Sequence, residues 1–270
     1  MGPVMANSNT NVKGMKYLQP GRTYSYDLDK DGKNEKIKYT KQSVNEDVEI
    51  VKVFINGKMS LNKRLNGSAS LNLCNLNKKD KYIEFILNAI GPSDIIEYMG
   101  IYRYNKQKVS QLFQVKGDTL YGKMSLYRYK DFVLGTGNTF YINADTPIWI
   151  RDLGSYYCKM PFLIKGNKIV ANKVSAYDIF SPSTTNYKKR MKFELKKLVT
   201  VYKTSSKVKG KAFTLKKGDK ITIDKIKPVK KSPATAYVRI NKGKKKGWIY
   251  IKEKGSAIDS SMFKEVPAWG

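Results

Sequence analysis

The sequence of 270 residues contains no histidine, only two cysteines, and no apolar run long enough to cross a membrane. Without imidazole there can be no Ser-His-Asp triad, no Cys-His nucleophile pair and no histidine metal ligand. A spanning helix needs about 18 or more consecutive apolar residues, so no membrane span is predicted. The most familiar hydrolytic mechanisms are therefore excluded.

The two cysteines, Cys74 and Cys158, lie far apart in the chain, and neither belongs to a Cys-x-x-Cys pair. Two interpretations stay open, namely two buried free thiols or one long-range disulfide. A reactive thiol is not expected, because no imidazole is available to activate it.

Acidic residues are also scarce, since 22 Asp and Glu stand against 52 Lys and Arg, a net charge of +30. The excess is concentrated in residues 188–254, which contain 24 Lys and Arg and 4 acids. This change in composition predicts a domain boundary between residues 181 and 198. Such a positive field predicts a polyanionic partner, with a lysine-rich surface that serves only solubility as the alternative.

Strand-forming residues, in contrast, are abundant. Segments rich in Ile, Val, Tyr and Phe are separated by turn pairs such as Asn56-Gly57, Gly117-Asp118 and Gly166-Asn167. The one short helical alternative is near residues 191–198. The chain is therefore predicted to be all-β, with two domains for its length and strands within 35–39, 48–55, 82–87, 101–104, 120–129, 140–142, 148–150 and 168–174.

Four of the 22 acids stand in the loop 27–35, where three carboxylates occupy alternate positions before a glycine. Alternating carboxylates on a tight turn bring their oxygens to one point, as a hard cation with many oxygen ligands requires. An EF-hand would have a glutamate where Lys38 stands, and helices on both sides. The alternative is a solvated Asp-Gly turn. The predicted calcium ligands are Asp27, Asp29, Asp31, the backbone carbonyl of Lys33, and Glu35.

The loop resembles the D-x-D-x-D-G-x-x-[DE] calcium hairpin of FG-GAP and VCBS-type repeats. Weaker matches follow at residues 81–85 (Lys-Tyr-Ile-Glu-Phe), 91–94 (Gly-Pro-Ser-Asp) and 101–104 (Ile-Tyr-Arg-Tyr). They resemble a degenerate repeat in which only the first copy keeps its acids. The resemblance implies a calcium-stabilised repeat domain over residues 18–185. Three units are too few for a closed propeller, so a propeller-like stack and a β-sandwich are both open.

Residues 196–255 are similar to bacterial SH3-like domains in the segments 198–206, 213–223, 237–240 and 246–251, the last with Gly-Trp-Ile. The resemblance implies a small barrel that binds bacterial cell walls, either peptidoglycan or an anionic wall polymer such as teichoic acid. The family commonly has a tryptophan where Ala236-Tyr237 stands, which puts a groove built on that ring in doubt. The predicted ligand-binding residues are Tyr202, Tyr237, Arg239, Lys244, Lys245, Lys246, Trp248 and Tyr250.

The two ends of the chain are predicted to lie outside these domains. Residues 1–17 read as a disordered linker with a cloning remnant and lack the features of a signal peptide. They would fit a mature secreted or cell-surface protein whose export signal has been removed. Residues 256–270 form a C-terminal tail, in which Trp269 packs on either domain.

The sequence thus predicts a non-catalytic, calcium-stabilised adhesion or binding protein, with a protein partner for the N-terminal repeats as a further option. One alternative is an accessory module of a wall-active enzyme, but neither Glu84 with Asp94 nor Asp145 with Asp152 stands out as a catalytic pair. Turns and surface pairing are the expected roles of these acids. The other alternative is nucleic-acid binding, which the charge permits but for which no recognition motif is present.

Overall fold

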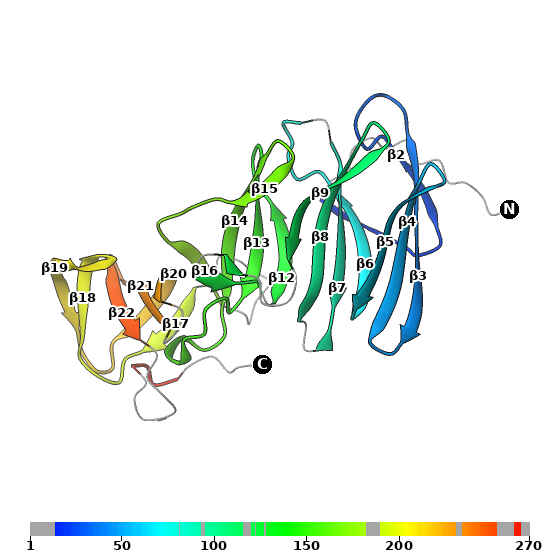
Figure 1. Ribbon diagram of the computed structural model, residues 1–270. Helices are drawn as coiled ribbons and strands as arrows, with labels where there is room; N and C mark the ends of the chain where they lie inside the picture. Colours follow the sequence, from blue (N-terminus) through cyan, green and yellow to red (C-terminus); the bar gives the residue numbers. More distant parts are fainter. Residues whose placement is uncertain are drawn as a thin grey trace. The chain divides into compact units, whose positions relative to one another are not determined.

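The computed structural model describes residues 14–80, 82–92, 95–115, 120–121, 123–126, 128–181, 190–230, 234–252 and 262–265. Within them the chain is built of β-strands, with a short 3₁₀ turn at Arg151–Leu153 and no α-helix (Figure 1). The all-β prediction is therefore confirmed. Among the described strands, none of the sheets closes into a barrel.

The chain divides into two compact units. The first contains Met1–Thr119, Phe132–Tyr141 and Pro161–Asn172, and the second contains Leu120–Asp131, Ile142–Met160 and Lys173–Gly270. The boundary predicted between residues 181 and 198 falls inside the second unit. The change in composition therefore does not coincide with the boundary between the two compact units.

The first sheet of the first unit is a meander of β2 (Thr23–Tyr26), β3 (Glu35–Asn45), β4 (Val48–Ile55) and β5 (Lys58–Asn66). Asn56 and Gly57, between β4 and β5, have φ angles of 52° and 80°. A two-residue hairpin turn of type I′ needs positive φ at both positions, and this requirement explains the Asn-Gly pair. The strand and the turn predicted here are confirmed.

The second sheet has the order β1-β6-β7-β8-β9 and contains β1 (Met15–Leu18), β6 (Ser68–Cys74), β7 (Glu84–Ile90), β8 (Ile96–Asn105) and β9 (Lys108–Val115). Met15 of β1 pairs with Cys74 of β6. The prediction of a linker up to residue 17 is therefore wrong for residues 15–17, which add an edge strand to this sheet.

Gly67 joins the two sheets, because β5 belongs to the first and β6 to the second. Its φ angle is 84°, and a Cβ atom there would lie 2.4 Å from the backbone oxygen of Ile90. The turn at residues 66 and 67 thus moves the chain from one layer to the next, and only glycine fits the close approach.

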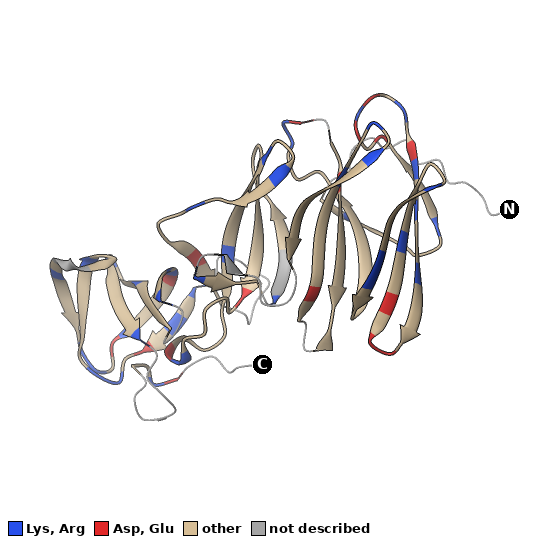
Figure 2. Cartoon of the chain, in the orientation of Figure 1, with Lys and Arg blue, Asp and Glu red and all other residues tan. Residues whose placement is uncertain are grey.

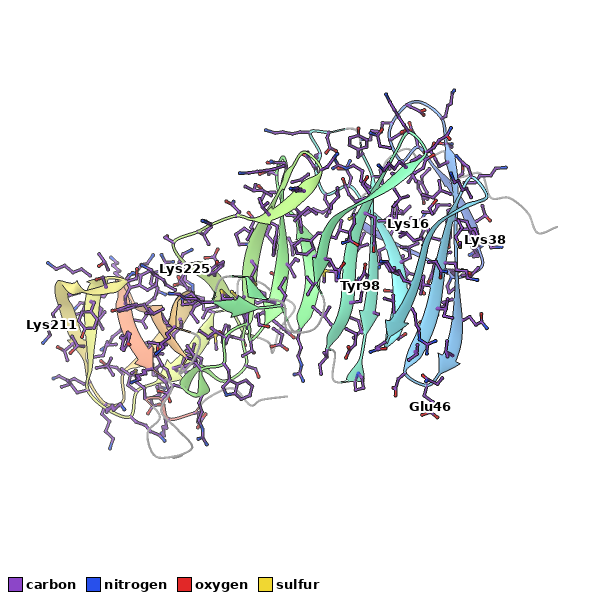
Figure 3. All side chains as sticks on the ribbon, in the orientation of Figure 1. Lys16, Lys38, Glu46, Tyr98, Lys211 and Lys225 are labelled. Atoms are coloured by element: carbon purple, nitrogen blue, oxygen red, sulfur yellow. The ribbon has the colours of Figure 1, made fainter. Side chains whose placement is uncertain are left out.

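The first unit is layered, and apolar side chains fill the space between its sheets. One core joins the first and second sheets and includes Tyr98, labelled in Figure 3. The hydroxyls of Tyr98 and Tyr102 hydrogen-bond to each other. A second core contains Phe113 of β9 and Phe162 of β14, whose ring centroids are 5.4 Å apart. Strand β7 lies between the two cores and is buried on both faces.

The layer beyond the second sheet uses the first-unit parts of β12 (Tyr129–Leu134), β13 (Thr139–Asp145) and β14 (Tyr157–Lys165), together with β15 (Lys168–Ala171). Phe140 stacks on Phe162 with a centroid distance of 5.5 Å. β14 and β15 form a hairpin whose turn is closed by Gly166. The turn predicted at Gly166-Asn167 is therefore confirmed.

The second unit contains a strongly basic sheet in which β16, β20, β21, β22, β18 and β19 are successive neighbours, while β17 also pairs with β20. A small hairpin, β10 (Leu120–Tyr121) with β11 (Met124–Ser125), belongs to the same unit. The strands of the basic sheet are β16 (Tyr177–Phe180), β17 (Met191–Glu194), β18 (Val199–Thr204), β19 (Ser206–Leu215), β20 (Lys220–Lys230), β21 (Thr235–Lys242) and β22 (Lys245–Lys252).

The short helical alternative and two strand predictions need correction. Residues 191–194 form a strand rather than a helix, because buried Met191 and Phe193 alternate with exposed Lys192. Residues 148–150 precede the 3₁₀ turn and form no strand, and the strand expected over 120–129 is interrupted between β10, β11 and β12. The predicted turn at residues 117 and 118 lies outside the described residues.

Cys74 and Cys158 are free thiols, and both are fully buried. Burial raises the pKa of each thiol well above its ordinary value. The disulfide alternative is therefore wrong, and both cysteines act as small apolar core residues.

Candidate functional site

The acidic loop 27–35 connects β2 to β3. One carboxylate oxygen from each of Asp27, Asp29 and Glu35 lies within 4.8 Å of the others, and all three side chains are buried. Two residues of the loop have positive φ angles, Lys30 at 53° and Gly32 at 89°, and the chain can therefore turn tightly around the carboxylates.

Backbone hydrogen bonds hold two of the three carboxylates. Asp27 accepts from the N–H groups of Asp31 (3.0 Å) and Gly32 (3.2 Å). Glu35, the first residue of β3, accepts through Oε2 from the N–H of Leu28 at 2.9 Å. The loop thus fixes these oxygens before any ligand is added.

Asp29 is held from the next sheet. Its Oδ2 accepts the backbone N–H of Lys106, in the turn between β8 and β9, at 3.0 Å, while its buried Oδ1 has no hydrogen-bond partner. Burial raises the pKa of Glu35, and repulsion from the neighbouring aspartates adds to the effect although the Leu28 N–H opposes it. The neighbouring carboxylates therefore repel one another, and a bound cation would supply the positive charge that offsets this repulsion.

The other two predicted ligands lie at the exposed tip of the loop. Asp31 is exposed, and its Oδ1 accepts the backbone N–H of Lys33 at 2.8 Å. The structure therefore brings together three of the five predicted ligands, and the Asp31 side chain is turned towards the backbone of its own loop.

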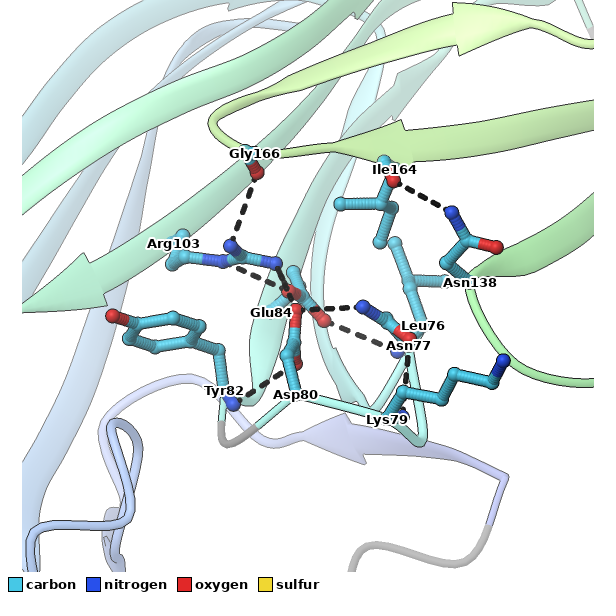
Figure 4. A network of polar contacts seen from close by, with 10 residues as sticks. All are labelled: Leu76, Asn77, Lys79, Asp80, Tyr82, Glu84, Arg103, Asn138, Ile164 and Gly166. Atoms are coloured by element: carbon cyan, nitrogen blue, oxygen red, sulfur yellow. Dashed lines mark hydrogen bonds and ion pairs between the residues drawn. The ribbon is translucent and has the colours of Figure 1, made fainter.

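A second loop, between β6 and β7, repeats one contact of the first (Figure 4). The backbone N–H of Leu76 donates to Oε2 of Glu84 at 3.1 Å, as that of Leu28 does to Glu35. Each glutamate is the first residue of the following strand. In this second loop a side chain supplies the positive charge. The guanidinium of Arg103 contacts Glu84 Oε1 through Nε (3.0 Å) and Nη2 (2.5 Å).

Arg103 is held on all sides. Its Nη2 also donates to Asp80 at 2.9 Å, its Nη1 donates to the backbone oxygen of Gly166 at 3.3 Å, and its guanidinium carbon lies 4.3 Å from the ring centroid of Tyr82 (Figure 4). Burial raises the pKa of Glu84 to about 6, although Arg103 opposes the rise. The expected surface role for Glu84 is therefore wrong, since its side chain is completely buried. Asp94 lies outside the described residues.

The repeat of this contact in the second loop was missed because the spacing differs. Leu28 and Glu35 are seven residues apart, whereas Leu76 and Glu84 are eight apart. The signal present in the sequence is a leucine between two Asp or Asn residues, followed by a glutamate that opens a strand.

Aromatic and cationic residues share one face of the basic sheet. Tyr202 of β18 lies opposite Trp248 of β22, which lies opposite Arg239 of β21. Tyr237 and Tyr250 are opposite each other in the next row, with ring centroids 5.1 Å apart. Directly opposed residues project to the same side of a sheet, so the structure brings these five of the eight predicted residues together.

Arg239 is fixed within this face by a bidentate pair, because its Nε and Nη2 each lie 2.8 Å from an oxygen of Asp224. Burial would raise the pKa of Asp224, but hydrogen bonds and charge from Arg239 outweigh it and hold that pKa below its ordinary value. The pair orients the guanidinium plane and leaves other cations to supply free positive charge.

The three predicted lysines lie where β21 turns into β22, and all are exposed. Lys246 is opposite Asn241 and two residues from Trp248, so it extends the aromatic face. Lys245 projects to the other side and its Nζ lies 5.7 Å from the ring centroid of Phe213, while Lys244 is in the turn. Further cations of this unit include Lys211 and Lys225, labelled in Figure 3, and Figure 2 colours the Lys and Arg residues that the structure describes.

Among the described residues, no helix is long and apolar enough to cross a membrane. No family model matches the chain, and neither the curated proteins nor the solved structures contain a significant match to it. The resemblances to FG-GAP or VCBS repeats and to SH3-like domains therefore rest on the residue patterns alone.

Proposed function

We propose that this chain is a non-catalytic, secreted or cell-surface protein that attaches to an anionic polymer of the bacterial wall. The binding surface is the outer side of β18, β22 and β21, named here the aromatic face. The observation that carries the proposal is the row of Tyr202, Trp248 and Arg239 in opposed register positions. The aromatic face consists of Tyr202, Tyr237, Arg239, Lys246, Trp248 and Tyr250.

The chemistry of this face suits a polymer of sugar or polyol units joined by phosphates. Aromatic rings offer flat apolar surface with a polar edge, against which the carbon skeleton of such a unit packs. Lys246 at the rim provides an exposed ammonium group for a phosphate oxygen. Because the rings are anchored in adjacent strands, little order would have to be gained on binding.

The finer fold assignments are part of the same proposal. Residues 196–255 form an SH3-like module, supported by the neighbouring order of β20, β21, β22 and β18 and by the packing of Gly247. A Cβ atom at Gly247 would lie 2.3 Å from Val201 Cγ1, so this glycine lets β22 approach β18 closely. Residues 18–185 form the FG-GAP or VCBS-like region, supported by its layered four-stranded sheet and acidic loop.

Calcium is the proposed ligand of the acidic loop. Asp27, Asp29 and Glu35 offer oxygens that converge within 4.8 Å, and the partnerless Oδ1 of Asp29 is among the atoms that a hard cation would satisfy. Asp31 would join after releasing the Lys33 N–H. The metal would neutralise mutual repulsion and so hold the β2–β3 connection against the neighbouring sheet.

Calorimetric titration of the intact protein with soluble, lipid-free teichoic acid tests the aromatic face. Trp248→Ala is expected to weaken binding at least about tenfold, and Trp248→Tyr to retain most of it, because stacking needs a ring. Lys217→Ala, which removes an exposed cation from the β19–β20 turn, is the matched control and is expected to have little effect. Equal affinity of the Trp248→Ala variant and the wild type would contradict the proposal.

A further inference from the structure

A cavity of about 490 Å³ lies over β17, β20 and β21 in the second unit. Phe193 and Ile221 contribute apolar lining, and Glu194 and Glu265 contribute two carboxylates. The wall also contains the polar residues Arg190, Lys192, Lys220, Thr222, Asn241 and Lys264.

One residue of the cavity wall, Asn241, lies opposite Lys246 of the aromatic face. Lys192 is opposite Thr222, Thr222 is opposite Asn241, and Asn241 is opposite Lys246. This row runs beside the row that contains Arg239 and Trp248, since Asn241 is two residues from Arg239 on β21. A chain-like ligand on the aromatic face could therefore extend into the cavity without leaving the surface of one sheet.

The charge available in the cavity is positive. The four cations of its wall outnumber the two carboxylates, Glu194 and Glu265, and Glu194 is already paired with Lys264, at 3.4 Å. Arg190, Lys192 and Lys220 are exposed, and in the described part of the chain none of them forms an ion pair of its own. Three cations around a water-accessible cavity attract an anion, and phosphate oxygens match their donors.

The buried side chain of Asn241 indicates that a ligand of this cavity forms hydrogen bonds as well as charge contacts. Its side chain is only 5% exposed, yet neither its Oδ1 nor its Nδ2 has a hydrogen-bond partner. A buried acceptor without a donor is costly, and proteins keep such groups mainly where something outside the chain satisfies them. Because Oδ1 accepts and Nδ2 donates, a ligand that satisfies the amide brings a donor such as a hydroxyl group as well as an acceptor such as a phosphate oxygen.

We propose that this cavity binds a phosphorylated polyol or sugar unit. A hydroxyl of the unit donates to Asn241 Oδ1, and its phosphate oxygens accept from Arg190, Lys192 and Lys220. The inference rests on the proposed function, because the adjoining aromatic face carries the next unit of the same polymer. It adds a second subsite and a chemical requirement, namely a hydroxyl group next to a phosphate.

The first experiment compares two probes by calorimetry at fixed ionic strength: a short poly(glycerol phosphate), which carries hydroxyl groups, and an inorganic polyphosphate with the same number of phosphates, which does not. Asn241→Leu is expected to weaken poly(glycerol phosphate) binding about fivefold to tenfold and to weaken polyphosphate binding clearly less, because polyphosphate offers no hydroxyl group to Oδ1. Lys192→Ala is expected to weaken both, and Lys217→Ala neither. Unchanged poly(glycerol phosphate) affinity in Asn241→Leu would overturn the inference.

A second experiment separates this inference from the proposed function. Monomeric sn-glycerol 3-phosphate is titrated into ¹⁵N-labelled full-length protein, and the side-chain amide signal of Asn241 is followed by NMR. A saturable shift of that signal supports the subsite even if the polymer fails to bind, in which case the proposed function fails alone. If the polymer binds and depends on Trp248 while the Asn241 signal does not move, the subsite fails alone. Asn241→Leu removes an amide group that has no hydrogen-bond partner, so the variant is expected to fold normally.

Discussion

Arg103 Nη2 lies 2.5 Å from Oε1 of Glu84, a carboxylate with no exposure to solvent. The same guanidinium occupies the charge-balancing position in the second loop that a calcium ion is proposed to occupy in the first. One loop would then be stabilised by a metal ion that can be removed, and the other by a side chain that cannot.

The pair predicts a large effect of removing one partner. Arg103→Met is expected to lower the free energy of unfolding by about 3–5 kcal/mol, because it leaves a buried carboxylate without its cation. Urea denaturation measures the loss. The double variant Arg103→Met with Glu84→Gln is expected to recover a substantial part of the stability, since no buried charge remains. A loss below about 1 kcal/mol in the single variant would show that the pair is not needed.

Glu84 also predicts a pH dependence. Its pKa is raised from 4.5 to about 6 by burial, so the folded protein binds a proton more readily than the unfolded chain does. The free energy of unfolding therefore falls as pH rises through this interval, and the contribution of about 2 kcal/mol present at low pH is lost above it. Denaturation at several pH values should show this decline in the wild type relative to Glu84→Gln. Parallel pH profiles of the two proteins would exclude the effect.

The acidic loop predicts stabilisation by calcium. At a concentration one hundred times the dissociation constant, calcium is expected to add about 2.7 kcal/mol to the stability of the folded state, visible as a rise in melting temperature. Asp29→Asn should abolish most of the rise because it removes one of the converging carboxylates. Asp47→Asn, an exposed acid in the β3–β4 turn, is the control that should keep it. A full calcium response in Asp29→Asn would contradict the site.

Gly67 and Gly57 provide a matched pair for the connection between the sheets. Both have φ angles near 80°, yet a Cβ atom at Gly57 meets nothing within 4 Å while one at Gly67 would strike the Ile90 oxygen at 2.4 Å. Alanine is expected to cost about 1–3 kcal/mol more at Gly67 than at Gly57, because only the first position adds a backbone clash to the strain. Equal losses of unfolding free energy for the two variants in urea denaturation would contradict the predicted clash at Gly67.

Local patterns account for the part of the fold that was predictable. Residues 48–55 and the Asn56-Gly57 turn follow from strand propensity and from the φ angles that the turn demands. Residues 191–194 were assigned less well, because a short apolar segment fits either a helix or a strand until its partner, β20, is known.

The candidate sites show the same limit. The acids of loop 27–35 were visible from their spacing, but the contact from Lys106 to Asp29 spans 77 residues and needs the packing of two sheets. The Glu84–Arg103 pair likewise depends on the register of β7 with β8. The contribution of Asn241 became visible only with the cavity, because burial without a partner is a property of the folded chain.

The most direct test of the account is co-sedimentation of the intact protein with purified Gram-positive walls, before and after removal of teichoic acid, at low and at physiological salt. The account predicts binding to native walls at physiological salt that is strongly reduced by teichoic acid removal and by Trp248→Ala. Absence of binding to native walls, or binding that is unaffected by both changes, would contradict it.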